Sequence, residues 1–346
     1  MIKALILAGG SSSGLLPLTI STPKPLLPVA NFPLLLFQID QFKKAGVREV
    51  ILSLAHQPRK IRDSFGDGSD LGILLRYHIE STPFGTAGAL KKTEYLIDDT
   101  VVVINGDILT EQSLEEVLVQ HKASGALVTL GVCLVDNPRP YGVVEMDSGN
   151  WVTGFVERPR GKSLRANTIN AGVYVLEPEI FQWIPGDVPF SFERDLFPLL
   201  LERQVPFFAS VFKSYWREIT RPDNYFQTNM DCLHGRIEVP SFAAFPDTRQ
   251  EHPDSRIQVE GDCVIDRSCT LKPGARISHS VIGSNCRIEE GARIRNSVLW
   301  PGCRIQKGAV VTGGILGRGV SIGEGATVRR NTILGDKSIL CSHSKV

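Results

Sequence analysis

The sequence of 346 residues predicts two folded parts in series: an α/β domain with a mostly parallel sheet, then a coil of short parallel strands. Two observations carry this prediction. Short apolar runs alternate with amphipathic segments over residues 1–236, and a regular repeat fills residues 257–346. The stretch between them, residues 237–256, combines prolines with mixed polar residues and is typical of a linker. The chain is also long enough for two domains.

The alternation in the first domain predicts its elements in order. Strands are expected at short apolar runs, and helices where apolar residues recur at helical spacing. The expected strands are Ile2–Ala8, Glu49–Leu54, Leu74–Ile79 and Val101–Ile104, and the expected helices are Leu34–Ala45, Pro58–Phe65, Gly88–Leu96 and Ser113–Ser124. Apolar strands between helices indicate a parallel sheet that is covered on both faces. Ligands of such sheets bind beyond the carboxyl ends of the strands, so the loops after Ala8 and Ile104 are the first candidates for a site.

The repeat in the second part has four copies in phase. They begin at Leu271, Ile288, Ile305 and Ile322, so that each copy starts 17 residues after the last. Each copy has two aliphatic residues six positions apart, followed by an aliphatic pair, which gives three apolar corners per coil. Stacked coils bury a thin aliphatic column, because each coil covers only its neighbours. The pattern resembles the hexapeptide repeat of left-handed parallel β-helices.

Composition and charge exclude several classes of protein. The net charge of +1 argues against a nucleic-acid-binding face. From Ile257 onward 13 basic and 7 acidic residues give +6, which is interpreted as a solvated basic face, or alternatively as a docking face for an acidic partner. Seven cysteines without a C-x-x-C pair fit a reducing compartment, and no apolar run is long enough to span a membrane. A cytoplasmic protein that contacts neither nucleic acid nor membrane is expected.

The loop after the first strand, Leu7–Leu15, contains three glycines that would let backbone N–H groups approach a phosphate. It is not a Walker loop, because Leu15-Leu16 follows Gly14 in place of Lys-Ser/Thr. Pro23-Lys24-Pro25 follows shortly afterwards. A lysine between prolines lies on a stiff segment that is suited to placing an ammonium group on a phosphate.

These two segments resemble the signature L-A-G-G-x-G-T-R-L-x-P-L-T, followed by P-K-P, of the sugar-1-phosphate nucleotidyltransferases, also called NDP-sugar pyrophosphorylases. Further family motifs match in order at Pro83–Leu90, Asn105–Asp107, Tyr141–Val144, Phe155–Pro159, Asn170–Tyr174 and Tyr215–Ile219. With a β-helix at the C-terminus, the pattern is most similar to the mannose-1-phosphate guanylyltransferases. Glucose 1-phosphate with dTTP or UTP stays open as the substrate pair.

The resemblance implies a reaction and a role for each matched residue. An oxygen of a sugar 1-phosphate attacks the α-phosphorus of a nucleoside triphosphate, pyrophosphate leaves and an NDP-sugar forms. The implied site comprises Leu7, Gly9, Gly10, Gly85 and Gly88 for the nucleotide; Lys24, Asp107 and Arg158 for catalysis; Gly142, Glu157, Arg158 and Asn170 for the sugar phosphate; and Asp107 with Glu218 for Mg²⁺. The β-helix is expected to assemble homo-oligomers, or hetero-oligomers with a related subunit.

Three charged positions depart from the family pattern. Gly14 stands where the family has the loop arginine, Arg158 replaces a lysine, and Glu218 replaces an aspartate. Loss of a cation near the triphosphate can cost orders of magnitude in rate. Two hypotheses follow: an active enzyme, and a catalytically impaired nucleotide-sugar-binding paralogue that regulates a partner.

A third hypothesis comes from a different class, because left-handed β-helices often belong to acyltransferases. Acyl transfer would need a positioned base, usually histidine. Only His279 lies within the coils and His343 in the tail, and both are expected to be exposed turn or tail residues. This reading is therefore the weakest of the three.

Overall fold

The computed structural model describes residues 2–10, 12–160, 166–241 and 256–346. Its contacts divide the chain into two compact units that do not follow chain order. Unit 1 comprises Met1–Ser11 and Gln38–Trp216, and unit 2 comprises Ser12–Phe37 and Arg217–Val346. Most of the expected linker, residues 242–255, lies outside the described residues, so the boundaries at 236 and 257 stay predictions.

Unit 1 is built on a mixed sheet of nine strands in the order β10-β9-β11-β6-β1-β4-β5, with β8 beside β11 and β12 beside β8. The four strands β6, β1, β4 and β5 are mutually parallel, whereas β11 runs antiparallel to β6. The strands are β1 (Lys3–Ala8), β4 (Glu49–Leu54), β5 (Leu74–Ile79), β6 (Val101–Asn105), β8 (Val128–Leu134), β9 (Gly142–Met146), β10 (Val152–Glu157), β11 (Thr168–Leu176) and β12 (Phe207–Phe212), with a short β7 (Ile108–Thr110) outside this sheet.

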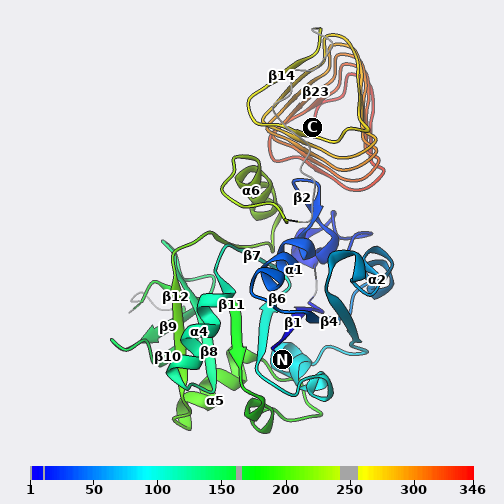
Figure 1. The fold of residues 1–346 in the computed structure, drawn as a ribbon. Coiled ribbons are helices and arrows are strands. Elements are labelled where there is room, and N and C mark those ends of the chain that lie inside the picture. The colour runs from blue at the N-terminus through cyan, green and yellow to red at the C-terminus, as the bar shows by residue number, and fades with distance from the viewer. Residues whose placement is uncertain (1, 11, 161–165, 242–255) are drawn as a thin grey trace. The chain divides into compact units, whose positions relative to one another are not determined.

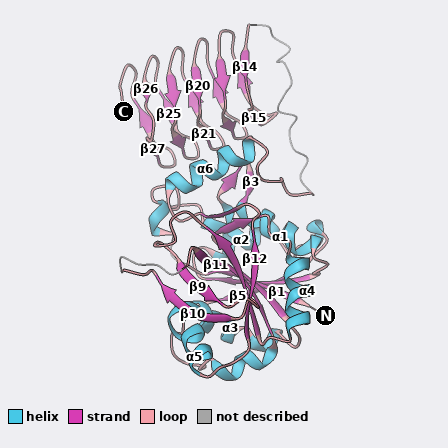
Figure 2. Cartoon of the chain, turned by 90° about the vertical axis from the view of Figure 1, so that its left-hand side faces the viewer, coloured by secondary structure: helices cyan, strands magenta, loops and turns pink. Residues whose placement is uncertain are grey.

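Helices cover this sheet on both faces, as Figure 2 shows. They are α1 (Leu34–Lys44), α2 (Pro58–Phe65), α3 (Gly85–Lys92), α4 (Leu114–Ser124) and α5 (Phe197–Glu202), with helical turns at Ser69–Leu71, Glu94–Leu96, Pro178–Trp183 and Phe192–Leu196. Consecutive residues Ala4, Leu5 and Ile6 of β1 are all fully buried, which confirms that both faces of the sheet are covered at this central strand.

The predicted elements agree with the structure except at one helix. β4, α2 and β5 have the predicted bounds. The helix expected over Gly88–Leu96 instead begins at Gly85 and ends at Lys92, where Thr93 closes it by donating its side-chain hydroxyl to the carbonyl of Leu90 at 2.7 Å. A separate turn over Glu94–Leu96 follows.

Unit 2 contains the predicted triangular coil, seen down its axis in Figure 1. Three parallel sheets of five short strands each form its sides. They are β14 (Gln258–Glu260), β17 (Arg276–Ser278), β20 (Arg293–Arg295), β23 (Val310–Thr312) and β26 (Thr327–Val328); β15 (Val264–Ile265), β18 (Val281–Ile282), β21 (Val298–Leu299), β24 (Ile315–Leu316) and β27 (Ile333–Leu334); and β16 (Thr270–Leu271), β19 (Arg287–Ile288), β22 (Arg304–Ile305), β25 (Ser321–Ile322) and β28 (Ile339–Leu340).

The column inside the coil consists of the predicted aliphatic corners together with small side chains, among them Ala275 and Ala292. Ile288, Ile305 and Ile322, one from each of three successive coils, are fully buried. Cys286 and Cys303 are also buried within this column, at positions where only a small side chain fits. Packing therefore accounts for these cysteines without a disulfide or a metal.

The rest of unit 2 packs on one side of the coil. It contains turns at Ser13–Leu15 and Lys24–Leu26, the hairpin β2 (Pro28–Val29) and β3 (Phe32–Pro33), the end of β13 (Trp216–Glu218), and α6 (Pro222–Leu233). Trp300 of the coil is fully buried and donates its indole N–H to the Tyr225 hydroxyl of α6 at 2.8 Å. The Tyr225 hydroxyl in turn donates to the carbonyl of Pro28 at 2.5 Å. No described helix is both long and apolar enough to cross a membrane.

Candidate functional site

The two loops singled out by the sequence lie side by side in unit 1. β1 pairs with β6 so that Leu7 stands opposite Asn105. The Gly106 N–H donates to the Leu7 carbonyl at 2.9 Å, and a Cβ built on Gly106 would lie 2.8 Å from that carbonyl oxygen. Only glycine fits this contact. The half-buried Asp107 therefore leaves its strand next to the glycine loop, as the adjacent strand ends predict.

A carboxylate that was not predicted lies against the glycine loop. A Cβ built on Gly9 would lie 2.5 Å from Oε1 of Glu80, whereas one built on Gly10 would meet no atom within 4 Å. Ser53, fully buried on β4, donates its hydroxyl to the same Glu80 oxygen at 2.7 Å. The Glu80 carboxylate thus lies within contact distance of Gly9, and Gly10 leaves open space beside the loop.

Gly85 and Gly88 lie against the backbone of Phe190. Gly85 has a φ of +75°, and its Cβ would lie 2.6 Å from the Phe190 carbonyl oxygen. The Gly88 N–H donates to that same oxygen at 2.9 Å. This close approach explains why both positions are glycine in the first turn of α3. Their contact with a nucleotide base stays a prediction.

A polar cluster surrounds the Tyr174 hydroxyl on β11. The register of β11 against β8 shifts between Asn170 and Tyr174, and Gly172 in that bulge has a φ of +71°. Asn170 donates its amide N–H to the Tyr174 hydroxyl at 3.1 Å, and the amide of Asn105 approaches the same hydroxyl at 3.4 Å. The Asn105 Oδ1 atom is buried without a hydrogen-bond partner among the described residues.

Glu193 joins this cluster, and sequence reasoning missed it. Its carboxylate accepts hydrogen bonds from Ser191 at 2.7 Å and Thr86 at 3.1 Å, while the Tyr174 hydroxyl lies 3.4 Å away. These contacts fix a half-buried negative charge beside the Tyr174 hydroxyl. The segment Ser191–Asp195 matches no motif that could have signalled this role.

Glu157 and Gly142 face each other across β10 and β9. Their Cα atoms are register partners, and a Cβ built on Gly142 would lie 3.0 Å from Oε2 of Glu157. Partial burial raises the pKa of the Glu157 carboxyl, the negative charge of Glu193 raises it further, and Arg158 opposes both. Arg158 itself is exposed, with Nε 3.3 Å from the Glu157 carboxylate. Within unit 1, Glu157 thus contacts both Gly142 and Arg158. Asn170 follows Ile169, whose Cα atom is the register partner of Val143 on β9.

Unit 2 contains Lys24, Gly14 and Glu218. Lys24 is half-buried at the start of its helical turn. A Cβ built on Gly14 would clash with the backbone carbonyl oxygen of Thr220. Thr220 in turn donates its hydroxyl to the Glu218 carboxylate at 3.4 Å. The backbone after Glu218 therefore occupies the space into which a side chain at position 14 would project, so this loop is built around glycine.

The predicted magnesium ligands are hard oxygen donors. Across the described ranges, no three acidic, histidine or cysteine side chains gather into a metal-binding group. Mg²⁺ does not need one, because it is usually held by one or two carboxylates together with substrate phosphates and water. Asp107 and Glu218 fit that donor chemistry, one in each unit.

The α/β sheet with a glycine loop and an adjoining Asn-Gly-Asp turn defines a nucleotide-binding class of protein, and the comparisons identify its family. The family model described as nucleotidyl transferase matches residues 3–235, and a model described as the EIF2B subunit epsilon LbH domain matches residues 249–346. The chain belongs to the nucleotidyl transferase family, a family of enzymes, and ends in a left-handed β-helix domain.

Named relatives specify the likeness further. Mannose-1-phosphate guanylyltransferase of Mycobacterium tuberculosis is 33% identical over 287 residues, which cover 81% of this chain and 79% of that protein. Mannose-1-phosphate guanylyltransferase 1 of Arabidopsis thaliana is 35% identical over 287 residues, with 81% and 78% covered. A Bacillus anthracis structure assigned as a glucose-1-phosphate thymidylyltransferase is similar in fold, with a TM-score of 0.63, 21% identity, and 70% of this chain and 98% of that chain covered.

Proposed function

We propose that the chain transfers a guanylyl group from GTP to mannose 1-phosphate, giving GDP-mannose and pyrophosphate. The relatives named above support this pair of substrates. The observation in this chain that carries the choice of base is the Glu80 carboxylate against Gly9.

Glu80 selects among nucleobases by its hydrogen-bonding capacity. An ionised carboxylate only accepts hydrogen bonds and repels phosphate, so the part of a nucleotide that it meets must be a donor. Guanine presents a ring N–H and an amino group on one edge, which two carboxylate oxygens can accept together. Uracil and thymine present one N–H between two carbonyl oxygens, and those oxygens would face the carboxylate. Ser53 holds Glu80 in place for this contact.

The chemistry requires charge neutralisation and alignment more than a covalent intermediate. A bond forms between an oxygen of the sugar phosphate and the α-phosphorus, while the bond from that phosphorus to the bridging oxygen of pyrophosphate breaks. In the proposal, the backbone at Gly9 and Gly10 holds the nucleotide and Lys24 neutralises phosphate charge. Arg158 meets the sugar phosphate with its exposed guanidinium group.

In the proposal, the sugar hydroxyls form hydrogen bonds with the polar cluster around the Tyr174 hydroxyl. Glu157 and Glu193 provide carboxylate oxygens, and Asn105 provides the buried oxygen that lacks a partner among the described residues. Hydrogen bonds from hydroxyls to carboxylates are strong and directional, so they would fix the orientation of the attacking phosphate. Mg²⁺ would neutralise charge on the phosphates when bound, and Asp107 would supply a carboxylate ligand from unit 1. The second expected ligand, Glu218, stays a prediction.

A second candidate function rests on Gly14. The family's loop arginine is absent, and the Thr220 carbonyl fills the space where its side chain would begin. The same fold could therefore bind a nucleotide sugar without efficient transfer and regulate a related subunit. In both readings we propose that the β-helix mediates homo- or hetero-oligomers in the cytoplasm. Transfer of a thymidylyl or uridylyl group to glucose 1-phosphate is the remaining alternative.

The test of base selection is Glu80→Gln. Its amide offers one donor and one acceptor, which suits uracil or thymine better than guanine. We expect the ratio of kcat/KM for GTP over UTP to fall by about 100-fold, because the site loses a matched charge-assisted contact and gains a mismatched donor. Glu115→Gln, an exposed carboxylate on α4, is the matched control and should leave the ratio unchanged. An unchanged ratio in Glu80→Gln would contradict the proposed role of this carboxylate.

A further inference from the structure

One side of the β-helix carries a ladder of arginines that the proposed transfer reaction does not use. It is the sheet β14-β17-β20-β23-β26. Arg276 of β17 lies directly beside Arg293 of β20, and Arg295 lies beside Ser278. All three arginines are exposed residues, whereas the intervening Ile277 points into the buried column.

The ladder holds like charges side by side, with the Glu260 carboxylate in the lining of the same pocket. Within the part of the chain that the structure describes, Arg276, Arg293 and Arg295 form no ion pair, whereas Arg287 on another sheet pairs with Glu289. Adjacent strands are about 4.8 Å apart, so Arg276 and Arg293 present two positive charges side by side. Like charges directly opposite each other destabilise a sheet, and a bound anion would relieve the repulsion.

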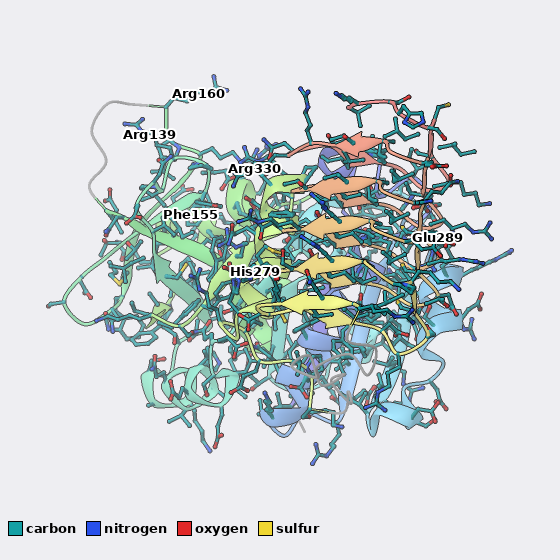
Figure 3. The ribbon with its side chains drawn as sticks, turned by 90° about the horizontal axis from the view of Figure 1, so that it is seen from above. Arg139, Phe155, Arg160, His279, Glu289 and Arg330 are labelled. Atoms are coloured by element: carbon teal, nitrogen blue, oxygen red, sulfur yellow. The ribbon has the colours of Figure 1, made fainter. Side chains whose placement is uncertain are left out.

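The arginines surround an open pocket of about 350 Å³. Its polar lining consists of Glu260, Arg276, Ser278, His279, Arg293 and Arg295. His279 occupies a left-handed turn with a φ of +45°, and its ring lies over Gly261, where a Cβ would clash with it. His279 is thus half-buried, so the expectation that it would be exposed is wrong, while His343 is exposed as expected. Figure 3 shows His279 and Arg330 at the same edge of the stacked coils and Glu289 at the opposite edge.

The pocket's size and lining decide among anionic occupants. Its volume lies within the range of small-molecule sites. An acidic protein segment would need a contact for an apolar or aromatic anchor residue. The aliphatic residues of this lining, Ile277 and Ile294, have buried side chains, so the lining that the structure describes offers no such contact. A second copy of the same face would place arginines against arginines. A compact phosphate group suits the guanidinium forks, which bind phosphate oxygens in pairs.

We propose that this pocket is a second anion site, which binds the phosphate groups of a small phosphorylated compound through Arg276, Arg293 and Arg295. Ser278 and His279 complete the set of side chains that can donate a hydrogen bond. The site would take inorganic pyrophosphate or the diphosphate of a nucleotide, since both present the same oxygens. Its existence does not depend on the reaction that unit 1 supports.

The test compares two double variants that remove the same charge from equivalent rungs. Arg276→Gln/Arg293→Gln alters the ladder. Arg287→Gln/Arg304→Gln alters two neighbouring arginines on the sheet of β19 and β22, and it is called the paired-rung variant because Arg287 pairs with Glu289. Calorimetric titrations with inorganic pyrophosphate and, separately, with GDP are run on the native chain and both variants at low and high salt. Both variants keep every residue proposed for catalysis, so binding to that site cancels in the comparison.

We expect the native chain and the paired-rung variant to bind one more equivalent than the ladder variant, or to bind at least about tenfold more tightly at this site. High salt should weaken the additional binding, because the pocket is open to solvent. Uptake of pyrophosphate would assign the site to free oligophosphates, and uptake of GDP alone would assign it to nucleotides. Identical isotherms for the two variants, or no additional uptake by the native chain, would overturn the proposal. Equal thermal melting of the variants would show that both are folded.

Discussion

Gly14→Ala isolates the steric consequence of the altered loop. The added methyl would clash with the carbonyl oxygen of Thr220, a backbone atom that cannot rotate away. Overpacking of this kind costs about 1–3 kcal/mol. The backbone at Gly14 does not have a positive φ, so alanine also gains roughly 0.4–1 kcal/mol by restricting the unfolded chain. The net expectation is a loss of about 0–2.6 kcal/mol of unfolding free energy relative to the native chain.

The matched control is Gly10→Ala in the same loop. A Cβ at Gly10 meets no atom within 4 Å, so this variant carries the unfolded-state gain without the clash. Thermal and denaturant unfolding of both variants measure the difference, and Gly14→Ala should melt several degrees lower, at roughly 2–4 °C per kcal/mol. Equal melting temperatures would refute the argument that Thr220 excludes a side chain here. An arginine side chain begins with the same Cβ atom, so the Gly14→Arg variant should also be less stable than the native chain and should gain no transferase activity.

Two further predictions concern the sugar-side cluster and the β-helix. Glu193→Gln removes a negative charge that raises the pKa of Glu157, so this pKa should fall and Glu157 should stay ionised to lower pH. The acid limb of the pH profile of kcat/KM for the sugar phosphate should therefore move to lower pH. The control Glu202→Gln, at an exposed site on α5, should leave this limb in place. Trp300→Phe removes the buried indole N–H that donates to the Tyr225 hydroxyl. Denaturant titration should show a loss of about 1–3 kcal/mol of unfolding free energy. A loss under 0.5 kcal/mol, which is roughly the effect of an ordinary surface substitution, would show that this hydrogen bond is unimportant.

The periodic parts of this chain could be predicted because their determinants are local. Each coil of the β-helix buries its corners only against its neighbours, so a 17-residue repeat starting at Leu271 specifies the stack without long-range information. The strand over Glu49–Leu54 and the helix over Pro58–Phe65 likewise follow from apolar runs and period. The helix at Gly85 was placed too late, because its first turn is fixed by the distant Phe190 backbone.

The rest of the site depends on contacts between residues far apart in sequence. Glu193 reaches the Tyr174 hydroxyl only because a bulge on β11 and a turn at Ser191 bring them together. The grouping of residues 12–37 with the β-helix depends on such contacts as that of the Asn31 side-chain amide, which donates to the Ile282 carbonyl at 2.9 Å. Motifs can nominate residues, but they carry no information about steric exclusion, such as that of Thr220 at Gly14.

The most direct test of the proposed function is Mg²⁺-dependent release of pyrophosphate by the purified chain. Mannose 1-phosphate and glucose 1-phosphate would each be offered with GTP, UTP, dTTP and ATP. The account predicts release that depends on both substrates and is greatest for mannose 1-phosphate with GTP. If no pair of substrates gave pyrophosphate release, and the folded chain still bound GDP-mannose, the result would contradict catalysis. It would establish the regulatory function instead.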